Sequence, residues 1–156
     1  MHSTFAIRRP ARLALAALLV GAVAACNDST GPDDDHGHAD EVASIRLTVT
    51  QGTASNSFTY TQGNAQRPPL VLPVGTSTVT ATFLADDGDV VEVDADDHAL
   101  AIQGIVPAGA FTFTRTGPFV GTVEAPLAGA ATANVCMTHG SHCDLEFVGV
   151  MVQIGG

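Results

Sequence analysis

The sequence contains no lysine and no tryptophan, and its only tyrosine is Tyr60. Without lysine the chain cannot carry a P-loop lysine, a Schiff-base lysine or a serine–lysine dyad, so the enzyme classes built on these groups are excluded. With so few large aromatic rings it also lacks the platforms on which sugars and single-stranded nucleic acids stack. Ser141 next to His142 has no Gly-x-Ser-x-Gly elbow around it. We therefore predict that the protein is not an enzyme.

Basic residues are also few, and they are unevenly placed. Only Arg46, Arg67 and Arg115 follow residue 26, whereas all 16 acidic residues lie beyond it, which gives that part of the chain a side-chain charge of −13. Such a surface repels phosphate backbones and anionic headgroups. We predict no nucleic-acid partner and expect cations or basic proteins to be favoured.

The first 25 residues have the layout of a signal peptide. Arg8, Arg9 and Arg12 precede a charge-free apolar run over residues 13–25. At 1.5 Å per residue this run would span roughly 20 Å as a helix, against about 30 Å of bilayer hydrocarbon. It is too short for a permanent transmembrane helix, so we expect cleavage at its end.

The residues at that end, Val23-Ala24-Ala25-Cys26, resemble the lipobox of bacterial lipoproteins. The resemblance implies that Cys26 is acylated and becomes the mature N-terminus, which would hold the protein on a membrane through several buried acyl chains. Asn27, where an inner-membrane retention signal would have Asp, implies sorting to the outer membrane, facing the periplasm or the cell surface. The alternative is ordinary secretion with cleavage nearby.

Residues 26–41 are polar, acidic and free of large apolar side chains. We predict that they form a flexible tether. Within it His36 and His38 are flanked by carboxylates and are candidate ligands for a transition metal, although ordering a flexible chain opposes binding. The alternative is a solvated spacer.

From residue 42 onward apolar and polar residues alternate with a period of two, which indicates half-buried strands. Gly, Pro and Asp separate the strands, and no helical stripe follows the signal. This pattern predicts a single antiparallel all-β sandwich over residues 42–156. The predicted strands cover residues 45–49, 58–61, 79–83, 91–93, 99–102, 111–113, 119–124, 131–135 and 143–154.

Two local features refine the predicted strands. Asp87-Gly88 predicts a two-residue hairpin turn with positive φ at both positions, followed by a return strand through Val91 and Val93. The last predicted strand has apolar residues at both alternating sets of positions. We therefore expect it to be central in its sheet or bulged near Gly149.

Several of these segments resemble group 2 bacterial immunoglobulin-like domains. The stretches that carry the resemblance are Val42-Ala43-Ser44-Ile45-Arg46-Leu47-Thr48-Val49, Leu72-Pro73-Val74-Gly75-Thr76, Thr80-Ala81-Thr82-Phe83, Gly121-Thr122-Val123 and Gly129-Ala130-Ala131-Thr132-Ala133. The chain lacks the tryptophan such domains usually carry and extends past their usual end. The resemblance implies an immunoglobulin-like fold and a binding or spacer role.

If Cys26 is acylated, Cys136 and Cys143 are the two cysteines that remain. In an oxidising compartment, at the ends of neighbouring strands, they most simply form a disulfide. The alternatives are thiolate ligands to a metal and free thiols.

Between these cysteines lie His139 and His142, which would face one point if the turn is tight. Imidazoles above an acidic surface suit Zn²⁺ or Cu²⁺, with His98 or a carboxylate such as Asp144 as a further ligand. The alternative is that they are ordinary polar turn residues. We thus expect an envelope lipoprotein that binds a metal ion without catalysis, or else an adhesion module that contacts an envelope protein.

Overall fold

The computed structural model describes residues 41–155, which form ten β-strands. The predicted signal peptide, Cys26 and the histidines of the predicted tether, His36 and His38, lie outside the described residues. The strands are β1 (Ser44–Gln51), β2 (Ala54–Thr61), β3 (Leu70–Leu72), β4 (Gly75–Leu84), β5 (Val90–Val91), β6 (His98–Val106), β7 (Thr112–Gly117), β8 (Val120–Ala125), β9 (Gly129–His139) and β10 (His142–Ile154). Within residues 41–155 no helix is long and apolar enough to cross a membrane.

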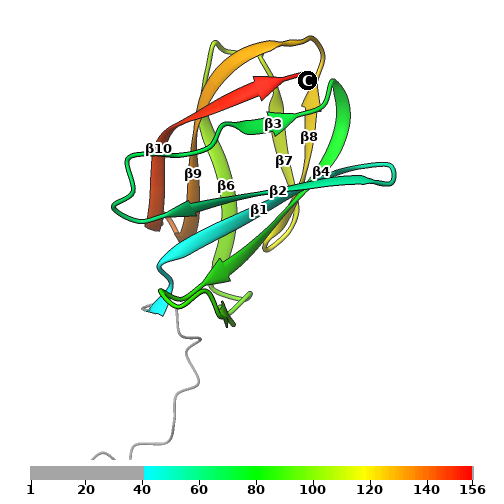
Figure 1. The fold of residues 1–156 in the computed structure, drawn as a ribbon. Helices are drawn as coiled ribbons and strands as arrows, with labels where there is room; N and C mark the ends of the chain where they lie inside the picture. The colour runs from blue at the N-terminus through cyan, green and yellow to red at the C-terminus, as the bar shows by residue number, and fades with distance from the viewer. Residues whose placement is uncertain (1–40, 156) are drawn as a thin grey trace, which may run out of the picture. The chain divides into compact units, whose positions relative to one another are not determined.

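The strands form two sheets that pack face to face (Figure 1). One sheet has the order β2-β1-β4-β8-β7, with β5 paired to the end of β4, and the other has the order β3-β10-β9-β6. In an immunoglobulin sandwich, strands A, B, E and D form one sheet and C, F and G the other. Strands β1, β4, β8 and β7 take the first set of positions and β6, β9 and β10 the second, which confirms the all-β, immunoglobulin-like prediction. One pairing, β3 with β10, is parallel.

The alternating sequence pattern places one face of each sheet in the core. Ile45, Leu47 and Val49 of β1 are buried, while Arg46 and Thr48 between them are partly exposed. From the opposite sheet, Leu100 and Phe147 are fully buried. Burying these side chains away from water supplies the main drive for the two sheets to pack.

Strand β10 is both central and bulged, as its two apolar faces predicted. It pairs with β9 on one side and β3 on the other, and its register with β9 shifts between Phe147 and Val150. The shift changes which alternate positions face the core, because side chains in a strand alternate between faces. Leu145 and Phe147 are buried before the bulge, and Val150 is buried after it, whereas Val148 is 61% exposed.

The turn after β4 is longer than the two-residue turn that the sequence predicted. The carbonyl oxygen of Ala85 accepts a hydrogen bond from the Gly88 N–H at 3.0 Å, and the Ala85 N–H donates to the Asp89 carbonyl oxygen at 2.9 Å. Three residues, 86–88, therefore form the loop, and its last position, Gly88, has φ +91°. A glycine in this conformation after a tight turn is typical of three-residue hairpin loops. The return strand β5 ends at Val91, so Val93 lies outside it.

Candidate metal site

Three histidines lie in one row across the neighbouring strands β6, β9 and β10. His98 is the register partner of His139, and His139 is also the partner of His142 across the turn at Gly140 and Ser141. Residues in register on adjacent strands lie about 5 Å apart at their Cα atoms. The fold thus brings His98 next to a turn about 40 residues later in the sequence.

The ligand atoms that converge belong to His98, His139 and Asp144. The Oδ2 atom of Asp144 lies 3.5 Å from Nε2 of His98 and 3.8 Å from Nδ1 of His139. The two imidazole rings are stacked, with centroids 4.8 Å apart and planes inclined by 24°. Within residues 41–155 this is the one group of three or more His, Cys, Asp or Glu side chains whose ligand atoms all lie within 4.8 Å of each other. His142 is not a member of it.

A turn at the start of β6 fixes the position of His98. The Asp94 carbonyl oxygen accepts the backbone N–H of His98 at 3.0 Å. The ring atom Nδ1 of His98 lies 3.1 Å from the same oxygen. The Asp94 side chain stabilises the turn by accepting the Asp96 N–H at 2.8 Å. Because a carbonyl oxygen only accepts hydrogen bonds, this contact favours a proton on Nδ1, and in the neutral ring with that tautomer the lone pair is on Nε2. That lone pair is on the side of Asp144.

A disulfide and a bulge position Asp144. Cys136 and Cys143 are bonded, with their Cα atoms 5.7 Å apart, which confirms the predicted disulfide. Neither cysteine is at a strand end: Cys136 lies within β9, and Cys143 is the second residue of β10.

The register of β10 with β9 shifts between Cys143 and Leu145, so Asp144 is the extra residue of a bulge. Bulges commonly redirect a side chain, and this one turns a carboxylate toward the two histidines.

The three groups suit a transition metal. In a tetrahedral zinc site with bonds of about 2.0–2.1 Å, neighbouring ligand atoms lie about 3.3 Å apart. The two nitrogen–oxygen distances, 3.5 Å and 3.8 Å, are close to this value. His98 is buried and held by its turn, whereas the His139 side chain is 57% exposed. Small movements of His139 would close the group on an ion, with a fourth position left open.

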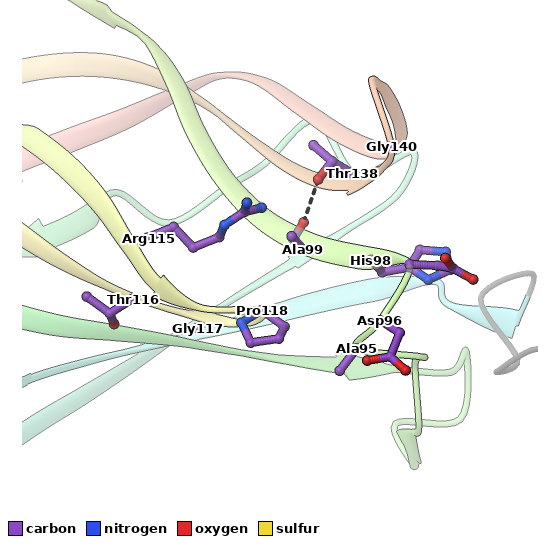
Figure 2. A pocket seen from close by; sticks show the side chains of 11 residues that line it. Ala95, Asp96, His98, Ala99, Arg115, Thr116, Gly117, Pro118, Thr138 and Gly140 are labelled. Atoms are coloured by element: carbon purple, nitrogen blue, oxygen red, sulfur yellow. Dashed lines mark hydrogen bonds between the residues drawn. The ribbon is translucent and has the colours of Figure 1, made fainter.

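A pocket of about 500 Å³ adjoins this group (Figure 2). It is lined by the turn before β6 and the first two residues of that strand, by the end of β7 and the turn after it, and by the residues on either side of His139. The charged lining residues are Asp96, Asp97 and Arg115. His98 belongs both to this lining and to the candidate metal group of His98, His139 and Asp144. The sequence offered no periodicity or motif that singled out Arg115, because its place depends on the pairing of β7 with β8.

Comparisons with known proteins found no match for this chain. No protein-family model matches the chain. No curated protein and no solved structure is significantly similar to it.

Proposed function

We propose that this chain is a non-catalytic, metal-binding lipoprotein of the bacterial cell envelope. In this proposal an acyl group on Cys26 anchors the domain in the outer membrane, and His98, His139 and Asp144 bind Zn²⁺ or Cu²⁺. The observation that carries the metal assignment is the convergence of two imidazole nitrogens on one carboxylate oxygen. The acidic charge of the chain adds to it by attracting cations.

The hydrogen bond of His98 favours a metal ligand over an ordinary ion pair. Histidines that bind metals usually donate their other ring N–H to a carbonyl or carboxylate, which orients the ring and fixes its tautomer. His98 makes this contact with the Asp94 carbonyl oxygen at 3.1 Å. A surface ion pair would need no such orientation and would contribute little to stability.

Calorimetric titration of the full-length protein in detergent with Zn²⁺ and with Cu²⁺ tests the metal site. We expect micromolar or tighter binding, and a loss of more than about 100-fold in His98→Ala and Asp144→Asn, because each removes one of three ligands. His142→Ala is the matched control, since His142 lies beside the group without belonging to it. Affinity weaker than about 0.1 mM, or equal affinity in all variants, would reject the metal site.

The anchor is tested separately, by labelling cells with radioactive palmitate. We expect label in the wild-type protein and none in Cys26→Ala, which should leave the membrane fraction. An unlabelled wild-type protein would reject the lipoprotein assignment and, with it, the proposed envelope location.

A second candidate function is that of an interaction module related to group 2 bacterial immunoglobulin-like domains. The observation that favours it is the edge strand β2, whose eight residues, Ala54–Thr61, include no charge, glycine or proline. Uncharged edge strands of this length offer unpaired backbone groups to a strand from another protein. A photo-crosslinker at Ser57 should then capture one envelope protein, whereas the same probe at Thr122, on the central strand β8, should not.

A further inference from the structure

The exposed side chain of Arg115 lines the pocket beside the candidate metal group. Among residues 41–155, no carboxylate lies within 4.0 Å of its guanidinium, and the side chain donates no hydrogen bond. Elsewhere in the domain, Arg67 is engaged by contrast, because it donates to the Val148 carbonyl oxygen at 2.9 Å and lies over the Phe147 ring. Arginine forms its strongest contacts with carboxylates, through two parallel hydrogen bonds. Arg115 is therefore placed to receive an anionic group of a ligand.

The side of the pocket away from Arg115 carries acidic residues. Figure 2 shows Arg115 and His98 on either side of Ala99, with Asp96 on the His98 side. With a divalent ion bound, this side would carry its two positive charges and the three negative charges of Asp96, Asp97 and Asp144, a net charge of about −1. A second carboxylate would be repelled here, whereas a neutral nitrogen donor would not. A nitrogen donor is also a preferred fourth ligand for zinc and copper.

The size of the pocket sets the size of the ligand. A volume of about 500 Å³ corresponds to a sphere about 10 Å across, within the range of pockets for small molecules. A molecule small enough for this pocket can carry a nitrogen donor at one end and a carboxylate at the other. Free amino acids have this composition.

We propose that the pocket binds a free amino acid together with the metal ion. The amino acid supplies a nitrogen to the fourth coordination position and its carboxylate to Arg115. This inference rests on the proposed metal function and deepens it, since the captured species becomes a metal–amino acid complex. Without its pairing to Arg115 the amino acid would bind only as a simple nitrogen donor.

The test uses L-histidine and histamine, which differ only in the carboxylate. Each is titrated calorimetrically into the zinc-loaded, full-length protein, and zinc retention is followed by equilibrium dialysis. We expect L-histidine to bind at least about ten-fold more tightly than histamine. In Arg115→Gln this preference should disappear while zinc affinity stays unchanged. Arg46→Gln is the matched control, because Arg46 lies on β1, outside the pocket.

The outcomes separate the two proposals. If zinc binds but the protein shows no preference for L-histidine, or if L-histidine strips the zinc away, the amino-acid inference is overturned and the metal site stands. If Arg115→Gln keeps the full preference, the inference is overturned as well. If zinc itself does not bind, both proposals fail.

Discussion

The Nδ1 atom of His98 lies 3.1 Å from the backbone carbonyl oxygen of Asp94, four residues earlier in the chain. This contact joins an acidic turn to the candidate metal group, because it orients the ring with Nε2 toward Asp144. The turn is held in part by the Asp94 side chain, which accepts the Asp96 N–H. In the proposed metal site, Asp94 would therefore be a positioning residue that acts through His98.

Asp94→Ala should weaken zinc binding about ten-fold, although residue 94 is not a ligand, because it loosens the turn that orients His98. Asp94→Asn should retain affinity, since its side-chain oxygen can still accept the Asp96 N–H. Calorimetry gives the two affinities, and the imidazole nitrogen shifts of His98 in NMR report its tautomer. Equal affinity in Asp94→Ala and in the wild type would contradict a positioning role.

Removing the disulfide should lower stability by about 2.5 kcal/mol, the chain-entropy value for a closed loop of eight residues. The variant is the double substitution Cys136→Ala and Cys143→Ala, and the measurement is urea unfolding, compared with the oxidised wild-type protein. The reduced wild-type protein should lose a similar amount. Zinc affinity should fall too, because Asp144 follows Cys143 directly. Cys26→Ala leaves the domain unchanged and should show neither effect.

Tyr60 should control the stability of the protein in alkali. Its side chain is fully buried, and burial raises the pKa of Tyr60 far above the ordinary value of 10.0. Above pH 10 the unfolded chain releases this proton and the folded chain keeps it, so stability should fall by about 1.4 kcal/mol per pH unit. Few other groups contribute in this range, because the chain has no lysine and its arginines stay charged.

Tyr60→Phe is the matched variant for this prediction. Among residues 41–155 the Tyr60 hydroxyl has no hydrogen-bond partner, so removing it should raise the free energy of unfolding at neutral pH by about 1 kcal/mol. Urea unfolding at neutral pH and above pH 10 measures both effects. A variant that loses stability with pH as steeply as the wild type would show that another group is responsible.

Gly121 should tolerate no larger residue, because a Cβ there would overlap the ring of Phe113 and lie 2.9 Å from the Thr114 carbonyl oxygen. Gly121→Ala should destabilise the domain by about 1–3 kcal/mol. Gly129→Ala is the control, since a Cβ at that position meets no atom of the described residues within 4 Å. Adding Phe113→Ala to Gly121→Ala should recover only part of the lost stability, because the contact between the new Cβ and the Thr114 carbonyl oxygen remains.

The fold could be predicted because the alternation of apolar and polar residues is visible within each single strand. Alternation in segments such as Ile45–Val49 marks one buried face, and apolar residues on both faces of the last strand indicated its bulge. The short β3 and the turn at Gly88 were harder to predict. Leu70–Leu72 forms a strand only by pairing with the distant end of β10, and the turn length is set by the hydrogen bonds of Ala85.

The site could be predicted only in part, for a related reason. Sequence proximity pointed to His139 with His142, and to His98 or Asp144 as possible additions. The structure brings His98, His139 and Asp144 together through a long-range register and a bulge, and neither feature has a local sequence signal. Arg115 reaches the pocket through the pairing of β7 with β8, so no motif identified it.

The turn between β7 and β8 is hydrogen-bonded to both sheets. The Phe119 carbonyl oxygen accepts the Ala81 N–H at 2.8 Å in one sheet, and the Pro118 carbonyl oxygen accepts the Leu100 N–H at 2.7 Å in the other. Pro118 also lines the pocket. Any motion that separates the two layers must therefore break the Leu100 bond beside the pocket, so a ligand bound there should slow hydrogen exchange at Leu100.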